Sequence, residues 1–367
     1  MQTLFALRQS RQANFGIGLE EIQESFQPDL NSMEVQDTEG LRKLAEEATA
    51  KFKKHFLTEG FESTGSEDER VDEAVTDAIR NYHQSNASDV RHFRKLMVDE
   101  VDRVYDRYLS VLQLMKIFRE LAESDTKRNH GNFINNSFLA ALAESDELEV
   151  LLLRKHISWD DEMQEVRQWF KDQVRSNETY QAYNEKTSVS NDDELKFVSF
   201  LIKTIIFKNE VIDKFLEEHD LNWAEDKAIV KSLTFKTAKK FFEEDVLELQ
   251  EMSYNWEEDK AYFVELYDGA LKAEKEYESL IAEKMQNWDI ERIALTDRVI
   301  IEMAIAEMIN FSSIPVKVTI NEYIEVAKRY STPKSKQFIN GILDVLSNEL
   351  MNLGVIKKSG RGLIDNK

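Results

Sequence analysis

Residues 313–344 read SIPVKVTINEYIEVAKRYSTPKSKQFINGILD, and this stretch decides the fold that the sequence predicts. It contains two of the three prolines in the chain, Pro315 and Pro333. Proline is well tolerated at the first position of a helix, because the amide hydrogen that it lacks would have no partner within the helix there. Both prolines therefore mark helix starts, and the stretch predicts two helices joined by a tight turn.

Polar residues around the prolines predict where these helices begin and end. Thr319 and Glu322 have the spacing of a capping box, in which each side chain bonds the backbone amide of the other residue. Thr332 is expected to cap the second helix just before Pro333. Gly354 is well placed to end that helix in the left-handed conformation.

Two further features predict close packing around the second helix. The segment Asp289–Phe311 carries apolar residues over a wide face, which is typical of a central helix in a bundle. Gly341 lies in the middle of the second helix, where glycine costs about 1 kcal/mol relative to alanine. We therefore expect another helix to approach Gly341 closely.

The turn between the two helices is basic in a protein that is otherwise acidic. The chain has a formal net charge of −22, yet residues 326–338 contain four basic residues and no acidic one. Two of them, Lys334 and Lys336, fall in the first turn of the second helix, where unpaired amides already carry partial positive charge. This arrangement favours a bound anion, and phosphate is the usual one. The alternative interpretation is an ordinary solvated turn.

Three runs of sequence resemble the signature of a known family. Residues 314–322 read IPVKVTINE, residues 338–344 read FINGILD, and residues 287–298 read NWDIERIALTDR. In this order and spacing they resemble the NusB family of bacterial transcription antitermination factors. Residues 132–139 (NFINNSFL) and 360–364 (GRGLI) further resemble the enlarged form of the family found in Bacteroidetes-type bacteria.

The resemblance implies an all-α protein of antiparallel helical bundles that acts in ribosomal RNA transcription. NusB-like factors bind a single-stranded leader element of nascent ribosomal RNA jointly with a small-subunit ribosomal protein, and they contact the RNA polymerase complex indirectly. The positions that match the turn used for RNA, with the two basic residues before it, are Lys334, Ser335, Lys336, Gln337, Phe338, Lys328 and Arg329.

The residue types in this turn suit single-stranded RNA, which is held by cations along its phosphates and by rings stacked on its bases. Lys334 and Lys336 can hold phosphates, Gln337 can hydrogen-bond a base edge, and Phe338 can stack. Many members of the family carry an acidic residue at the position of Lys334, and the lysine favours phosphate. Phe338 can also be a core residue beneath the turn.

Two other places are candidate contacts through the resemblance. Residues 1–13 predict a helix that resembles the later part of the family's first helix, and its Arg8 and Arg11 are RNA contacts or ordinary surface arginines. The arginine-rich opening of that helix is missing, so either the natural start lies upstream or this part has been lost. Asp297 and Arg298 match the protein-partner region, where Asp297 is an acidic contact or part of a salt bridge within the bundle.

The remaining sequence is predicted to be an acidic insertion into the family core. We expect the first helix of the core at 1–15, a mostly helical insertion at 16–257 with a mobile loop near 60–70, a NusB-like bundle at 258–353 and a basic tail at 354–367. Within the insertion, Val90–Glu123 and Leu41–Leu57 are predicted helices.

A possible internal repeat aligns residues 197–229 with residues 262–294. Both segments contain an Asn-Trp pair, at Asn222 and Asn287. A duplicated helical hairpin would explain the match, and helices of similar pattern can also match by chance.

Composition excludes several classes of function. Eleven glycines, three prolines and 32% charged residues favour an all-helical protein. No run approaches the roughly 20 apolar residues that span a bilayer. The absence of cysteine excludes disulfides and thiolate chemistry and suits a reducing cytoplasm, and the six histidines show no metal-ligand spacing. With no P-loop, dinucleotide fingerprint or hydrolase motif, we predict a non-enzyme without metal or cofactor.

Two functions remain open. The first is an antitermination factor that binds RNA through the basic turn, and the alternative is a protein-binding helical adaptor with little or no RNA affinity. Residues 326–367 carry a net charge of +5, which leaves −27 for the rest of the chain. Nucleic acid is therefore expected to be repelled everywhere except at this one end.

Overall fold

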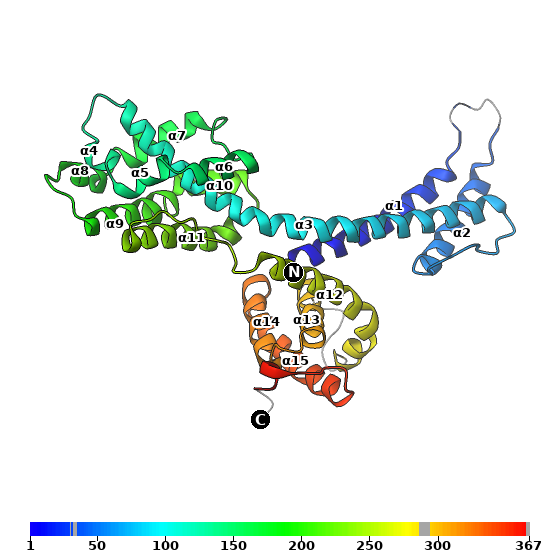
Figure 1. Ribbon diagram of the computed structural model, residues 1–367. Coiled ribbons are helices and arrows are strands. Elements are labelled where there is room, and N and C mark those ends of the chain that lie inside the picture. The colour runs from blue at the N-terminus through cyan, green and yellow to red at the C-terminus, as the bar shows by residue number, and fades with distance from the viewer. Residues whose placement is uncertain (30, 32–34, 286–293, 365–367) are drawn as a thin grey trace. The chain divides into compact units, whose positions relative to one another are not determined.

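The computed structural model describes residues 1–29, 31, 35–285 and 294–364, and the regular structure of these residues is helical throughout (Figure 1). The all-α fold class is thus confirmed. The chain forms two compact units, of which the first combines Met1–Val98 with Glu257–Lys367 and the second is Asp99–Trp256. The boundary between them falls inside one long helix, α3 (Glu69–Ser124).

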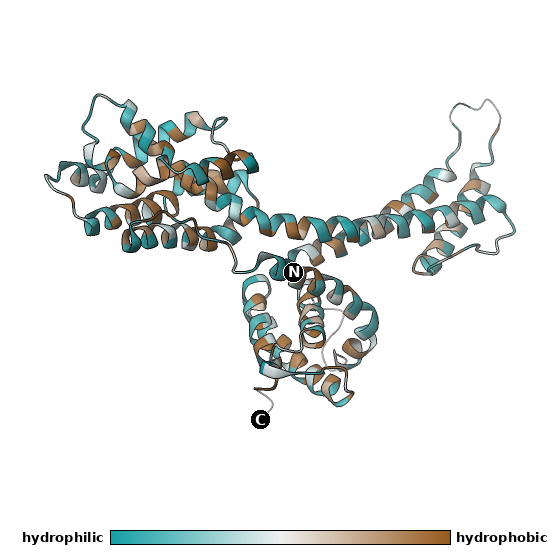
Figure 2. Ribbon diagram, viewed as in Figure 1, coloured by the Kyte–Doolittle hydropathy of each residue, from teal (hydrophilic) through white to brown (hydrophobic). Residues whose placement is uncertain are grey.

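Helices from both ends of the chain build the first unit. They are α1 (Gln2–Ser25), α2 (Thr38–His55), the first part of α3, α12 (Trp256–Met285), α13 (Leu295–Asn310), α14 (Val316–Tyr330), α15 (Ser335–Asn352) and a 3₁₀ turn (Gly360–Leu363). Buried apolar residues of α12–α15 form one hydrophobic cluster, and Leu4 and Leu7 of α1 belong to it. Figure 2 shows hydrophobic and hydrophilic residues alternating along the helices of this bundle. The start of the chain therefore lies in the same core as its C-terminal bundle.

Helix α13 is the central helix of this bundle. It buries residues on nearly all sides and packs against α1, α14 and α15. The sequence predicts a helix here from Asp289, but residues 286–293 lie outside the described residues, and α13 as described begins at Leu295.

A second hydrophobic cluster in this unit joins α1, α2 and the start of α3. Its buried members include Ile22, Phe52 and Val75, one from each helix. This packing explains why α1 continues to Ser25, beyond the helix predicted at 1–13, and why α3 begins at Glu69 and not at Val90. The helical segments beyond the predicted bounds are rich in polar residues. Their few apolar residues therefore give only a weak helical periodicity in the sequence.

The second unit is a bundle of shorter helices around its own core. These are α4 (Gly131–Ile134), α5 (Ser137–Ala143), α6 (Asp146–Lys155), α7 (Met163–Trp169), α8 (Glu178–Glu185), α9 (Asn191–Phe200), α10 (Glu210–His219) and α11 (Trp223–Glu244), with the later part of α3. Two π-helical segments, Phe170–Val174 and Leu201–Ile206, continue α7 and α9 and contact one another.

The two halves of the predicted repeat fold differently. Residues 256–285 form one continuous helix, whereas the corresponding residues 191–220 are divided into α9, a π-helical segment and α10. The division occurs where Asn209 caps α10 by accepting hydrogen bonds from the amides of Val211 and Ile212. The second Asn-Trp pair, at Asn287, lies outside the described residues. The described residues therefore do not support a duplicated hairpin.

The predicted capping box at Thr319 is wrong. Helix α14 begins at Val316 with Pro315 at the N-cap, which places Thr319 one turn inside the helix. Thr319 is fully buried, and its hydroxyl finds no hydrogen-bond partner among the described residues. Pro315 sets the helix start, because its fixed φ angle suits the entry into a helix and it has no amide hydrogen to satisfy.

Helix α15 begins later than predicted and ends as predicted. It starts at Ser335, whose amide donates to the carbonyl oxygen of Thr332, so Pro333 lies in a turn before the helix. At the other end Gly354 has a φ of 69°. The Val355 amide donates to the Leu350 carbonyl, and the Gly354 amide donates to the Met351 carbonyl. These two bonds are the Schellman motif, which stabilises a helix end.

The expected helix contact at Gly341 is absent. A methyl group added at this glycine would meet no atom within 4 Å among the described residues. Gly341 is half-buried, and packing against the residues that the structure describes does not account for the glycine.

The tail after α15 folds back onto the connection between α13 and α14. The Ser359 amide donates to the Ser312 carbonyl, and the Lys358 ammonium group donates to the Phe311 carbonyl. A methyl group on Gly362 would lie 2.1 Å from the Ser312 carbonyl oxygen, so only glycine fits there. Half-burial lowers the pKa of Lys358, whose ammonium group is held at the Phe311 carbonyl.

Candidate nucleic-acid interface

A chain of hydroxyl groups fixes the turn between α14 and α15. The Ser331 hydroxyl donates to the carboxylate of Asp297 and lies 2.9 Å from the Ser335 hydroxyl. The Ser335 hydroxyl lies in turn 2.8 Å from the hydroxyl of Thr332. Asp297 stands in the first turn of α13 and is 5% exposed. A buried carboxylate on the central helix thus anchors the turn.

Four cationic side chains surround this turn, and two of them interact with neighbouring side chains. Lys328 forms an ion pair with Glu325, and the Arg329 guanidinium lies 5.7 Å from the ring centre of Tyr330. Lys334 and Lys336 are exposed, and the described residues include no ion-pair partner for either. Their ammonium groups lie at the N-terminal end of α15, where an anion is favoured.

The side chains that follow the lysines present one polar and one aromatic group. Gln337 is exposed, whereas Phe338 is half-buried and packs against the hydrophobic cluster of the bundle. Phe338 therefore contributes to the core of the bundle, and its predicted stacking on a base stays a prediction. Ser335 is 5% exposed and its hydroxyl bonds within the turn, and its predicted contact with RNA stays a prediction.

Arg8 and Arg11 lie in ion pairs within the first unit, and their predicted contact with RNA stays a prediction. Arg8 bridges Glu274 and Glu302, with 2.5 Å to the Glu302 carboxylate. Arg11 lies 2.8 Å from the Glu274 carboxylate. The Arg8 side chain is 12% exposed and that of Glu302 only 3%. Burial lowers the pKa of Arg8 and raises the pKa of Glu302, and each charge is retained by the other.

Asp297 and Arg298, the predicted contacts to a protein partner, both bond other residues of the bundle. Asp297 is buried and supports the turn, so it is not available to a partner in this structure. Arg298 lies 3.0 Å from Glu302 and 2.8 Å from Glu278, and about a third of its side chain is exposed. The alternative interpretation of Asp297 was a salt bridge within the bundle, and its partner shown among the described residues is instead the Ser331 hydroxyl.

Sequence reasoning missed the role of Asp297 as a support for the turn. The available signal was the group of hydroxyl residues between 331 and 335, which need acceptors when they are buried. Because the acceptor is more than thirty residues away in sequence, spacing alone does not identify it.

We expect Asp297→Ala to lower the free energy of unfolding by about 1–3 kcal/mol, because it removes the acceptor of a buried hydroxyl chain. Chemical denaturation measures this loss. Asp297→Asn keeps a side-chain oxygen and should lose less. Equal stability of Asp297→Ala and the parent protein would show that the turn does not depend on this carboxylate.

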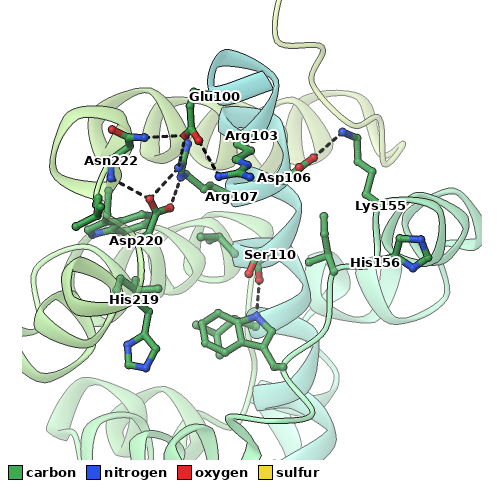
Figure 3. Close-up of a pocket in the computed structure, with 17 residues that line it drawn as sticks. Glu100, Arg103, Asp106, Arg107, Ser110, Lys155, His156, His219, Asp220 and Asn222 are labelled. Atoms are coloured by element: carbon green, nitrogen blue, oxygen red, sulfur yellow. Dashed lines mark hydrogen bonds and ion pairs between the residues drawn. The ribbon is translucent and has the colours of Figure 1, made fainter. Parts of the chain in front are cut away.

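The second unit contains a separate pocket of about 580 Å³ between α3, the end of α6 and the α10–α11 connection (Figure 3). Its central cation, Arg107, is bonded to Asp220 and Asp226. Lys155 at the rim lies 2.5 Å from Asp106. The charged groups in its wall thus satisfy one another, and we assign no ligand to this pocket.

Two features are absent from the part of the chain that the structure describes. No group of three or more histidine, aspartate or glutamate side chains there is arranged to hold a metal ion. No helix in that part is both long and apolar enough to cross a membrane.

Comparison with known proteins identifies the family. The family model described as "NusB family" matches residues 227–348, which include the α14–α15 turn. The transcription antitermination protein NusB of Dictyoglomus thermophilum is 36% identical over 132 residues, which cover 35% of this chain and 90% of that protein. The chain belongs to the NusB family.

Two further NusB proteins match this NusB-family chain over a smaller share of their own length. The NusB protein of Chloroherpeton thalassium is 40% identical over 130 residues, 35% of this chain and 58% of that protein. The NusB protein of Salinibacter ruber is 43% identical over 99 residues, 27% of this chain and 62% of that protein. The chain thus spans about three fifths of the length of these two relatives. No solved structure matches the chain.

Proposed function

We propose that this chain is a transcription antitermination factor that binds the single-stranded leader of nascent ribosomal RNA through its α14–α15 turn. The observation that carries the proposal is the pair of exposed lysines, Lys334 and Lys336, beside the partly accessible ring of Phe338. They stand on a turn that the buried Asp297 holds in place. The relatives described above are named transcription antitermination proteins.

The charge distribution supports a partner in RNA binding. With a net charge of −22, the protein repels nucleic acid at a distance, and the turn offers few phosphate contacts. We propose that a small-subunit ribosomal protein, rich in basic residues, completes the RNA-binding interface and makes its electrostatic potential more positive. The complex would contact RNA polymerase indirectly and act in the cytoplasm, where transcription takes place. The chain itself would perform no catalysis.

Salt dependence gives this proposal a quantitative form. Each neutralised phosphate on a single strand contributes about −0.7 to the slope of log K against log salt concentration. Two contacts, from Lys334 and Lys336, therefore predict a slope near −1.4 for the protein alone. A much steeper slope would require cations outside the turn.

The double variant Lys334→Glu/Lys336→Glu tests the proposed interface. We expect it to weaken binding of a short fluorescent RNA from the ribosomal RNA leader of Salinibacter ruber by about tenfold or more and to abolish the salt dependence. Fluorescence anisotropy measures both. The matched control Lys53→Glu/Lys54→Glu makes the same change in net charge on exposed lysines of α2 and should bind as the parent protein does.

A protein-binding adaptor with little RNA affinity is the second candidate function. The ion pairs of Arg8 and Arg11 favour it, because they remove two cations from the RNA surface that the sequence predicts. A parent protein that binds a small-subunit ribosomal protein but no leader RNA, alone or in that complex, would support the adaptor and reject the RNA interface.

A further inference from the structure

Helix α11, in the second unit, is strongly basic although the chain is acidic overall. Residues 227–242 contain five lysines and no acidic residue. Residues 196–208, which run from α9 through the π-helical segment Leu201–Ile206, contain three more lysines and again no acidic residue. The two segments pack against one another (Figure 1). Together they carry +8, which leaves −30 for the rest of the chain. The C-terminal end is therefore not the only basic part of this protein.

Some of these lysines form ion pairs, and others do not. Lys227 pairs with Asp213 of α10, and Lys240 pairs with Glu248. Three others have no ion-pair partner among the residues that the structure describes, namely Lys203, Lys231 and Lys236. Lys203 and Lys236 are exposed, and Lys231 is half-buried.

The three lysines without ion-pair partners lie around the half-buried ring of Phe235. Lys231 precedes Phe235 by four residues, so the two side chains share one side of α11, and Lys236 follows directly. Lys203 comes from the π-helical segment, and its ammonium group lies 4.0 Å from the centre of the Phe235 ring. The attraction between a cation and an aromatic ring holds Lys203 beside α11. Lys203, Lys231, Phe235 and Lys236 are called the α11 face below.

The lysines of α11 repel one another. Lys227 and Lys231 are four residues apart, as are Lys236 and Lys240, and like charges at this spacing destabilise a helix. A bound anion would offset this repulsion. Because the cations of the α11 face come from two segments of the fold, they suit an extended row of phosphates better than a single small anion.

We propose that the α11 face binds the phosphate backbone of a double-stranded nucleic acid. Lysines neutralise phosphates, and such contacts position a nucleic acid without reading its sequence. A single strand is held in addition by rings that stack on its bases. The ring of this face, that of Phe235, instead has the Lys203 ammonium group over it. A double helix keeps its bases stacked inside and needs no free ring.

The residue types of the α11 face favour a nucleic acid over an acidic protein. All eight cations in residues 196–208 and 227–242 are lysines. Lysine is depleted at protein–protein interfaces, where arginine and accessible aromatic residues are enriched. This proposal goes beyond the proposed function, because it concerns the other unit of the chain and another form of nucleic acid.

The double variant Lys231→Glu/Lys236→Glu tests the α11 face. The probes are a fluorescent RNA hairpin and a DNA duplex of the same stem sequence, and fluorescence anisotropy at low salt measures their binding. We expect the affinity for both to fall about tenfold or more, because two phosphate contacts become repulsive. The melting temperature should not fall, because the variant removes repulsion between lysines.

The salt dependence of the parent protein gives a second measurement. Each neutralised phosphate on a DNA duplex contributes about −0.9 to the slope of log K against log salt concentration. Contacts from Lys203, Lys231 and Lys236 therefore predict a slope of about −2.7. A slope close to zero would reject phosphate contacts as the basis of binding.

Lys127→Glu/Arg128→Glu is the matched control in the same unit. Both residues are exposed in the connection between α3 and α4, which lies across the unit from α11 (Figure 1). The control changes the net charge by the same amount and should bind both duplexes as the parent protein does. If it weakens binding as much as Lys231→Glu/Lys236→Glu, the effect is one of net charge and the α11 face is rejected.

The same assay separates this proposal from the RNA interface at the α14–α15 turn. Lys334→Glu/Lys336→Glu should leave binding of the duplexes unchanged, and Lys231→Glu/Lys236→Glu should leave binding of the single-stranded leader RNA unchanged. Either interface can therefore fail while the other stands.

Three outcomes would overturn the α11 face as a duplex site. The first is a parent protein that binds neither duplex. The second is a preference for single strands that Phe235→Leu removes, which would make the ring a stacking platform. The third is an α11 variant that binds both duplexes normally but loses binding to a small-subunit ribosomal protein, which would make the face a protein contact.

Discussion

Replacing Arg8 with methionine is expected to lower the free energy of unfolding by about 3 kcal/mol, which is the lower end of the range for breaking a buried ion pair. The variant leaves the nearly inaccessible carboxylate of Glu302 without its closest cation. The loss stays at the lower end because Arg298 still bonds Glu302 and Arg11 still bonds Glu274. Chemical denaturation, followed by circular dichroism, measures the change.

Arg11→Met is the matched control for Arg8. It removes the same functional group one turn further along α1, and its side chain is twice as exposed as that of Arg8. Exposed ion pairs contribute about 0–1 kcal/mol, so this variant should remain close to the parent protein in stability. If Arg8→Met folds with unchanged stability but loses RNA affinity, Arg8 is an RNA contact and its ion pairs are dispensable.

Replacing Phe338 with alanine is expected to reduce RNA affinity by about 5- to 150-fold, because a stacked base contributes about 1–3 kcal/mol. The ring also packs against the bundle, so some stability should be lost as well. A fully buried phenylalanine costs about 3–5 kcal/mol on truncation, and the loss for this half-buried ring should be smaller.

Two measurements separate these effects of Phe338→Ala. RNA affinity is measured well below the melting temperature, where the variant is folded, and thermal unfolding is measured in parallel. Leucine at this position is the control, since it refills much of the packing volume but cannot stack. Normal RNA affinity in a folded Phe338→Ala protein, with a lowered melting temperature, would make Phe338 a packing residue only.

The sequence predicts the helical class and the α14–α15 hairpin well, because these depend on local signals. Pro315 and Gly354 act through their own backbone conformations, and each marks a helix end in the structure. The start of α3 at Glu69 could not be read in the same way. Its first turns are stabilised by α1 and α2 through Val71 and Val75, which are distant contacts with little local periodicity.

The candidate site was harder to predict because tertiary packing decides which of its charged side chains are buried and which stay exposed. The three acids of α13, at Asp297, Glu302 and Glu307, look like surface charges in sequence, yet all are buried. Each has a different partner: Ser331 for Asp297, Arg8 and Arg298 for Glu302, and Tyr262 for Glu307. Lys328, Arg329, Lys334, Lys336 and Gln337 keep the exposure that local reasoning gave them, because they lie on the outside of the turn and of the helix ends beside it.

The core shared by the two ends of the chain has a consequence for synthesis. Arg8 and Glu302 are 294 residues apart in sequence, so α1 leaves the ribosome long before the helices that cover Leu4 and Leu7. At typical translation rates of about 5–20 residues per second, that interval lasts roughly 15–60 s. The cluster of α1, α2 and α3 can form early, because its residues are all made within the first part of the chain. In a nascent protein, the C-terminal part of α1 would thus already be packed against α2 and α3. The apolar face around Leu4 and Leu7 would stay uncovered until translation is nearly finished.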